Sequence, residues 1–278
     1  MRSLLPAFVC ALLISPCLAQ DAKPPVTEKP AVKPAEQPAE KPKEPAKDQP
    51  ASKPAEELPT AEALFEKHIA AIGGMDALKG EKNRLVRATY IGPGSIGEGS
   101  LRVLRVAPNK FYQTLEVPGV VSQEVWCNGE EGWMRDTNNG TNKLKSEALI
   151  EFKRQSDFLG EANYKMRYKE IKTLSSEKFG AIDAFVVKAV PKEGRERTIY
   201  FDAKTGFIIG IRMVGGAGPE SDAVTTISDY KDFNGIMQPT KTVTKAGPGE
   251  TTIIIKKIDS NLTAMPSTEP PDEVRSVK

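Results

Sequence analysis

The chain has few of the residues on which most catalytic and metal sites are built. Its 278 residues include three cysteines, two tryptophans and a single histidine, His68. One histidine excludes a site with several histidine ligands, and it leaves a Ser-His-Asp triad almost no material. We expect His68, which lies in a helical stretch, to occupy a surface or lid position.

Cysteine is too scarce to stabilise the fold through disulfides. Cys10 and Cys17 lie in an N-terminal segment with the pattern of a secretory signal, and its removal leaves Cys127 alone. A lone thiol on a strand beside Trp126 indicates core filler rather than a nucleophile. Core packing is likewise favoured over ligand anchoring for Trp126 and Trp133.

Neither sign of charge predominates. The 39 Lys and Arg residues and 37 Asp and Glu residues give a formal net charge of +2. The two signs alternate without a basic stripe, so the sequence does not favour nucleic acid as a partner. A Gly-Lys-Ser/Thr phosphate loop is also missing, and Gly92–Gly97 is typical of a hairpin loop. The sequence predicts no cofactor and no metal.

The one long apolar run is too short to span a membrane. Leu4–Leu13 is followed by small residues ending in Ala19, which is the pattern of a secretory signal peptide over residues 1–20. We therefore expect a protein exported to the periplasm or cell envelope, with no transmembrane span in the mature chain. The alternative is a lipid anchor on Cys17, but Pro16 is a poor match to the small residue that such processing needs.

Composition divides the rest of the chain into three parts. Residues 21–59 are rich in Pro, Ala, Lys and Glu, and they favour a disordered, extended linker. We interpret this linker as a solvated spacer, the alternative being an arm that binds an envelope protein partner. Residues 60–259 are long enough for one domain with a sizeable core. Residues 260–278 return to Pro, Ser and charge, and we expect a disordered tail.

Two hairpin phrases indicate a long antiparallel meander. In Tyr200–Ile209 the turn needs a positive φ before the chain re-enters a strand, and Gly206 provides it. In Asp229–Pro239 the Asn234-Gly235 pair fits a two-residue turn whose twist matches the flanking strands.

Two segments have the pattern of helices. Thr60 is expected to cap the first, which ends at Gly73-Gly74, and the second covers Ser146–Leu159. Everything else indicates strands, about a dozen in all, which predicts an α+β fold. The expected strands cover residues 85–91, 100–107, 110–117, 121–127, 131–136, 170–178, 184–190, 197–201, 207–214, 224–233, 238–245 and 251–259.

Apolar residues two apart recur along many of these strands, and such residues share one face. A wide, strongly curved sheet with only two helices leaves either an apolar pocket or a concavity that the helices plug. The alternation alone does not distinguish the two.

In several of these segments, the chain resembles the outer membrane lipoprotein-sorting proteins of LolA/LolB-like fold. The resemblance rests on Ala71–Leu78, on Arg105–Phe111 and on the two hairpin phrases, and it covers most of residues 61–259. It implies an unclosed, highly curved antiparallel β-barrel, with helices as a lid over an apolar concavity that accommodates acyl chains. The Pro-rich linker is not part of the basic sorting carrier.

Three hypotheses of function follow. The first is an exported, non-enzymatic carrier or binding protein whose cargo is an acyl lipid or a lipoprotein, bound by removal of apolar surface from water. The second is an envelope interaction or scaffold module with the same fold and no lipid cargo. The third, which we favour least, is a carboxylate-based hydrolase using Glu130, Glu131 or Asp202. The candidate cavity residues are Leu101, Val103, Phe111, Leu115, Val125, Trp133, Phe152, Phe158, Phe201, Ile209, Ile211 and Met213.

Overall fold

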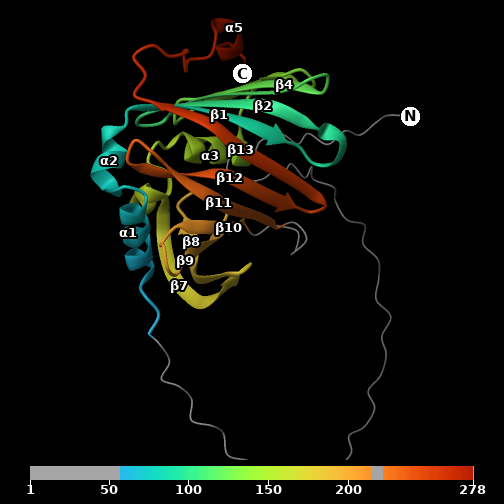
Figure 1. Ribbon diagram of the computed structural model, residues 1–278. Coiled ribbons are helices and arrows are strands. Elements are labelled where there is room, and N and C mark those ends of the chain that lie inside the picture. The colour runs from blue at the N-terminus through green and yellow to red at the C-terminus, as the bar shows by residue number, and fades with distance from the viewer. Residues whose placement is uncertain (1–56, 214–221, 278) are drawn as a thin grey trace, which may run out of the picture. The chain divides into compact units, whose positions relative to one another are not determined.

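The domain is built on one antiparallel sheet. A computed structural model describes residues 57–213 and 222–277 (Figure 1). Within these described residues, thirteen strands follow one another in the order β6-β5-β4-β3-β2-β1-β13-β12-β11-β10-β9-β8-β7. The strands are β1 (Asn83–Ile91), β2 (Glu98–Val106), β3 (Lys110–Val117), β4 (Val121–Cys127), β5 (Gly132–Asp136), β6 (Gly140–Lys143), β7 (Tyr168–Phe179), β8 (Ile182–Pro191), β9 (Arg197–Asp202), β10 (Ile208–Met213), β11 (Ala223–Phe233), β12 (Ile236–Ala246) and β13 (Gly249–Ser260).

The sheet curves without closing, because β6 and β7 lie at its two ends and do not pair with each other. The predicted fold class, an unclosed and curved antiparallel barrel with helices, is thereby confirmed. Each predicted strand agrees with an observed one to within two residues at either end, and the strands 110–117 and 121–127 have the predicted bounds. The short strand β6 was not predicted.

The helices are few and short. They are α1 (Ala61–Ala71), α2 (Gly74–Gly80), α3 (Ser146–Ser156), α4 (Tyr164–Arg167) and α5 (Asp272–Arg275), with 3-10 turns η1 (Gly94–Ile96) and η2 (Gly160–Asn163). The predicted cap of α1 is confirmed, since the Thr60 hydroxyl accepts a hydrogen bond from the Ala63 amide at 3.2 Å. The chain does turn at Gly73-Gly74, but α2 then begins at once, and the sequence analysis missed it. The second predicted helix ends at Ser156, three residues early.

Both predicted hairpin turns form, and glycine is what permits them. Gly206 has φ +78°, and its amide donates to the Asp202 carbonyl at 2.8 Å. Asn234 and Gly235 have φ values of +57° and +82°, as a two-residue turn of this kind requires.

The same two turns hold α1 in place. The Lys67 ammonium donates to the Ala203 carbonyl in the first turn at 2.7 Å. At the second turn, the Met237 amide donates to the Ile72 carbonyl at 3.1 Å. Gly73 lies so close to this turn that a Cβ there would overlap the carbonyl oxygen of Gly235. The end of α1 is therefore fixed by backbone contacts as well as by apolar packing.

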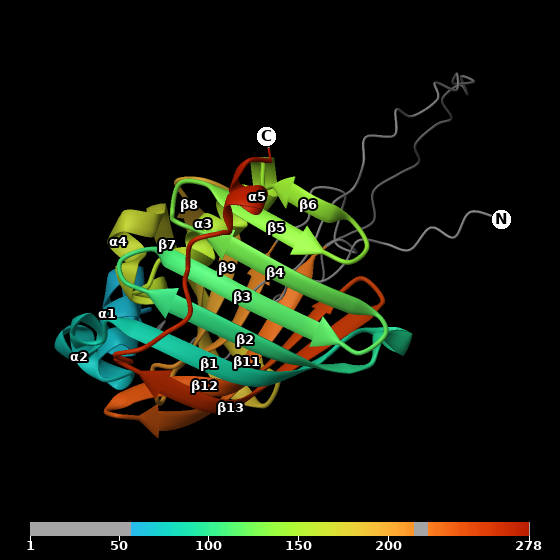
Figure 2. The same ribbon diagram turned by 90° about the horizontal axis from the view of Figure 1, so that it is seen from above.

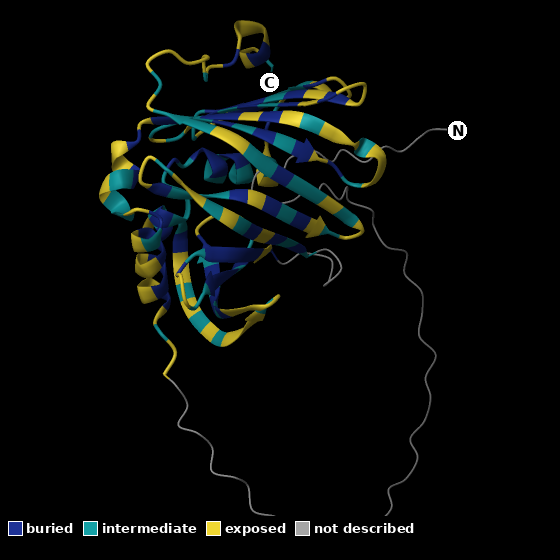
Figure 3. Cartoon of the chain, in the orientation of Figure 1, coloured by how far each residue is buried: buried dark blue, intermediate teal, exposed yellow. Residues whose placement is uncertain are grey.

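Two apolar clusters fill the inner face of the sheet, and Figure 3 shows the buried residues along both halves. The α1 core joins Leu64, Phe65 and other α1 residues to strands β8–β12. The α3 core joins Phe152 to strands β1–β5 and β13. Each helix thus covers its own half of the sheet, as α3 does beneath β1–β4 in Figure 1.

The C-terminal tail follows a defined path, contrary to the disorder expected for residues 260–278. It crosses the outer face of the sheet (Figure 2), where Val274 of α5 is fully buried against Trp126 and Trp133. Glu269 forms an ion pair with Lys110 at 2.7 Å. The composition, rich in Pro and charge, did not reveal this segment, because Pro270 and Val274 are its only buried residues among 261–277.

Glycine should be far more important at position 73 than at position 74. Both residues have positive φ, but a Cβ would meet the Gly235 carbonyl only at Gly73, whereas open space surrounds Gly74. We expect Gly73→Ala to lower the free energy of unfolding by about 2 to 5 kcal/mol, from strain and overlap together. Gly74→Ala, the matched control, should cost about 1 to 2 kcal/mol from strain alone. Equal losses in urea titrations would contradict the close approach.

Candidate functional site

Most of the predicted cavity residues do lie on the inner face of the sheet. They divide between the two cores, so no single group of side chains brings them together. Leu101, Val103, Phe111, Leu115, Val125 and Phe152 belong to the α3 core, while Phe201, Ile211 and Met213 belong to the α1 core. Side chains from α1 and α3 pack directly against these strands. The Phe65 ring, for example, lies 5.0 Å from that of Phe201.

Two of the candidates belong to clusters other than the two inner cores. Trp133 pairs across the strands with Trp126 and contacts Val274 on the outer face. Ile209 is the extra residue of a bulge, because Ile208 pairs with Phe201 and the next pair is Gly210 with Tyr200. The bulge reverses the alternation, so Ile209 packs with Tyr200 in a separate cluster.

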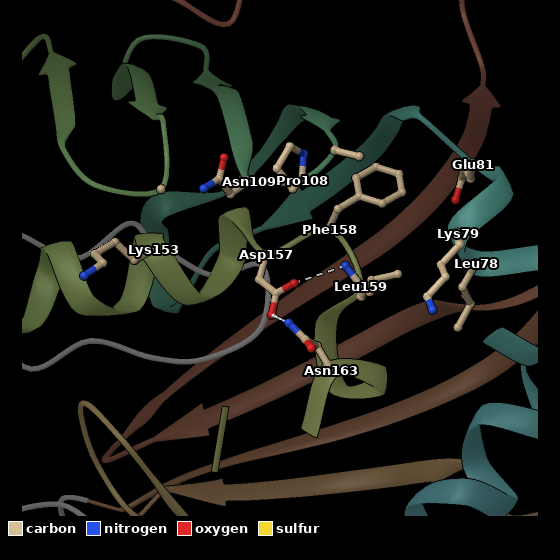
Figure 4. A pocket seen from close by; sticks show the side chains of 12 residues that line it. Leu78, Lys79, Glu81, Pro108, Asn109, Lys153, Asp157, Phe158, Leu159 and Asn163 are labelled. Atoms are coloured by element: carbon tan, nitrogen blue, oxygen red, sulfur yellow. Dashed lines mark hydrogen bonds between the residues drawn. The ribbon is translucent and has the colours of Figure 1, made fainter. Parts of the chain in front are cut away.

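The last candidate, Phe158, borders a pocket of about 460 Å³ at one end of the inner face (Figure 4). This volume is within the range of small-molecule sites, about 300 to 1,000 Å³. The walls come from α2, the β2–β3 turn, the β4–β5 turn and the segment from the end of α3 through η2. The lining residues are Leu78, Lys79, Glu81, Ala107, Pro108, Asn109, Gly129, Lys153, Asp157, Phe158, Leu159 and Asn163.

The pocket combines an apolar wall with charged groups at its border. Its two carboxylates are already engaged in bonds within the fold. Asp157 accepts hydrogen bonds from Asn163 at 3.1 Å and from the Leu159 amide at 3.3 Å, both drawn in Figure 4. Glu81 holds Arg84 through both of its oxygens. This arrangement orients the loops and does not resemble a pair of carboxylates free for acid-base chemistry.

The pocket residue Asp157 belongs to a network of ion pairs that the sequence analysis missed, since it also accepts from Arg167 at 2.8 Å. Glu161 accepts from Arg154 at 3.0 Å and from Arg167 at 2.9 Å. Glu151 accepts from Arg154 at 2.7 Å and from Arg197 at 2.8 Å. Although burial alone would raise the pKa of Glu161, Arg167 and Arg154 hold it at about 2. The network therefore remains fully charged at neutral pH.

Arg197 shows how tightly this network is enclosed. The residue is 2% exposed, and its Nε and Nη1 atoms have no hydrogen-bond partner among residues 57–213 and 222–277. Unpaired buried donors are rare and often indicate water or a ligand group.

His68 is buried. Of the two positions expected for it, at the surface or in the lid, the structure excludes the surface. Its Nδ1 lies 3.2 Å from the Gly206 carbonyl oxygen, and because a carbonyl only accepts, Nδ1 carries the proton. Its ring contacts Phe201 edge-on at 6.1 Å. Burial lowers the pKa of His68 to about 4. The role that these contacts give His68 is structural, because they join α1 to the first hairpin turn.

Two features are absent from the described part of the chain. Within residues 57–213 and 222–277, no helix is long and apolar enough to cross a membrane. Over the same residues, no group of three His, Cys, Asp or Glu side chains is placed to hold a metal ion.

Comparison with known proteins identifies the fold. No family model matches the sequence, and no curated protein matches it. Among solved structures, a LolA superfamily protein from Nitrosomonas europaea is 13% identical, with a TM-score of 0.54 over 75% of this chain and 96% of that chain. The fold is LolA-like. A DUF1329 family protein from Desulfovibrio piger is 11% identical, with a TM-score of 0.54 over 73% of this chain and 94% of that chain.

The LolA-like fold accounts for the features that the sequence analysis quoted. Ala71–Leu78 forms the junction between α1 and α2, and Arg105–Phe111 forms the β2–β3 turn at the pocket. The two hairpin phrases carry the turns that hold α1. These segments meet at one end of the sheet, around the site where the helices cover the concavity.

The buried histidine should make stability depend on pH. In the unfolded chain, an ordinary histidine pKa near 6.5 means that protons bind as pH falls through 6.5, whereas folded His68 stays neutral until about 4. Stability is therefore complete above pH 6.5 and is lost on acidification towards pH 4. We expect a loss of about 2 kcal/mol between pH 7 and pH 5.

The variant His68→Asn tests the origin of this slope. Asparagine keeps a donor for the Gly206 carbonyl but does not titrate, so the loss between pH 7 and pH 5 should disappear in urea titrations. Since His68 is the only histidine in the chain, a slope that persists in this variant would place its origin elsewhere.

Proposed function

We propose that this protein is an exported, non-enzymatic carrier or binding protein for an acyl lipid or a lipidated protein. The observation that carries the proposal is a LolA-like sheet whose inner face is apolar on both halves, with a pocket of about 460 Å³ at the edge of the helical lid. A pocket with an apolar wall and a few polar or charged groups is the usual form of a site for a small ligand, and an amphiphile has the matching apolar and polar parts.

Binding would be driven by the acyl chain. Each CH₂ group removed from water contributes about 0.8 kcal/mol, so a chain of ten buried groups contributes about 8 kcal/mol before the costs of association. The apolar pocket residues Leu78, Pro108, Phe158 and Leu159 offer the first contact. Deeper entry would require α3 to move, because Phe152 packs against Phe111 with ring centroids 5.8 Å apart.

The proposed place of action is the periplasm or cell envelope. It rests on the predicted signal peptide and linker, residues 1–20 and 21–59, which lie outside the described residues apart from 57–59. The linker would tether or space the domain within the envelope. A lipid anchor at Cys17 remains the alternative to cleavage after Ala19 or Gln20.

Absence of catalysis is part of the proposal. The carboxylates that border the pocket are bound by Arg84, Arg167 and neighbouring donors. Asp202, one of the candidate acids, accepts three hydrogen bonds within its own turn, from Lys204 and Thr205. Each is occupied in shaping a loop, which supports binding over hydrolysis.

Filling the pocket should weaken lipid binding. Leu159 lies on its wall, and Leu159→Trp would place an indole in the space that an acyl chain needs. We expect at least a tenfold rise in the Kd for a fluorescent fatty acyl probe. The control is Val120→Trp, which adds the same group on an exposed turn and should leave the Kd unchanged. An unchanged Kd in Leu159→Trp would reject the pocket as the entry site.

Native mass spectrometry of the protein purified from its own envelope tests the class of function. Co-purifying acyl lipid or a lipidated peptide is the expected result. A ligand-free mass that persists after lipid is added would instead favour the envelope interaction module.

A further inference from the structure

Arg105, a cation on the inner face of the sheet, forms no ion pair with any residue that the structure describes. Arg105 lies on β2, where it pairs directly with Arg84 of β1 and Phe111 of β3. Direct cross-strand partners share a face, and Phe111 packs in the α3 core. The half-buried Arg105 side chain therefore points to the concave side of the sheet, two residues before the pocket residue Ala107.

The pairing of Arg84 with Arg105 places like charges directly opposite each other, which is destabilising. Arg84 is fully compensated. It pairs with Glu81, donates to the Gln238 side chain at 3.1 Å and lies 5.4 Å from the centre of the Phe158 ring. Arg105 makes no side-chain hydrogen bond or ion pair anywhere in the described part of the chain.

The surrounding network cannot supply a partner, because its acids are already taken. Glu81 holds Arg84, Asp157 holds Arg167, Glu161 holds Arg154 and Arg167, and Glu151 holds Arg154 and Arg197. Among the residues that the structure describes, four carboxylates thus face five arginines, and Arg105 is the one without an ion pair to any of them.

The electrostatic environment agrees with this geometry. Burial, followed by the charges of Arg84, Arg167 and Arg154, lowers the pKa of Arg105 to about 9, although the charge of the pocket residue Asp157 acts in the opposite direction. An arginine remains charged at neutral pH even so, and its positive charge is then poorly compensated. An anion at this place would relieve the repulsion among four arginines at once.

From the surplus charge and its position beside the pocket we propose that Arg105 binds the anionic head group of the ligand, a phosphate or a carboxylate attached to the acyl chain. The inference rests on the proposed function and narrows it to anionic amphiphiles. The apolar wall at Phe158 and Leu159 would hold the chain, while Arg105 selects the head group.

Two lipids with the same acyl chains separate the two proposals. Phosphatidylglycerol carries a phosphate and diacylglycerol does not, so their Kd values on the exported, full-length protein isolate the contribution of the head group. We expect phosphatidylglycerol to bind at least tenfold more tightly. If neither lipid binds, the proposed function fails, whereas equal binding of both would overturn only the head-group assignment.

Substitution of Arg105 then tests the residue. Arg105→Gln should weaken phosphatidylglycerol binding at least tenfold and leave the Kd for diacylglycerol within twofold, while Arg105→Lys should retain part of the preference. The matched control is Arg102→Gln on the same strand, since Arg102 is exposed and should affect neither Kd. A loss of affinity for both lipids in Arg105→Gln would contradict selection of the head group.

The stability of the ligand-free variants gives an independent readout. Because Arg105→Gln removes an uncompensated charge, its Tm should match or exceed that of the wild type, whereas a structural arginine would cause a fall. Inorganic phosphate provides the last comparison. If phosphate alone raised the Tm of the wild type as much as phosphatidylglycerol does, the site would bind a free anion and the head-group assignment would be wrong.

Discussion

The contact between α1 and two hairpin turns determines how the concave face of the sheet is covered. An open antiparallel sheet of this width exposes one apolar face unless helices pack on it. Three polar contacts hold the C-terminal half of α1, and they are made by Lys67, His68 and Ile72. The helix therefore has one position rather than a range of positions. Gly73 makes this docking feasible, since its missing side chain lets the Gly235 turn approach the helix end. The α1 core, the start of α2 and hence one wall of the pocket all follow from this contact.

The second helix is held by a different kind of interaction. α3 covers the other half of the sheet through Phe152, while its charged residues Glu151 and Arg154 face the ion-pair network. Enclosing charges in this way costs desolvation free energy, which their mutual attraction offsets only when each charge has a partner. Such a network contributes little net stability, but it fixes the relative orientation of the residues that it joins. Breaking one of these pairs would leave a buried charge without a partner, at a cost of about 3 to 5 kcal/mol, so any movement of α3 on ligand entry has to keep the network intact.

The sequence predicted the fold far better than it predicted the site, and the reasons are physical. Hairpin turns and the cap of α1 depend on single residues, such as Gly206 and Thr60. Their role in the backbone can be recognised from a few neighbouring residues in the sequence. The β10 strand is buried on both faces, so its run of Ile208-Ile209-Gly210-Ile211 carries no alternation that would reveal the bulge. The sequence analysis assigned Trp133 to the wrong face of the sheet, because that face depends on the loop after Cys127. The pocket and the ion pairs join residues far apart in the chain, and charged residues such as Arg154 or Arg197 look like ordinary solvated positions in the sequence.

Arg105 interrupts a pattern that an apolar residue would have continued. Leu101 and Val103 precede it on the same face of β2, and both pack in the α3 core. A leucine at this position would extend that core, and it would also remove the repulsion from Arg84 on the neighbouring strand. Local violations of this kind, where a more stable choice is evident and a compensating contact is missing within the fold, are expected at functional sites. The energetic cost is then recovered when an anion binds, so the affinity for an anionic ligand and the instability of the empty site have the same origin.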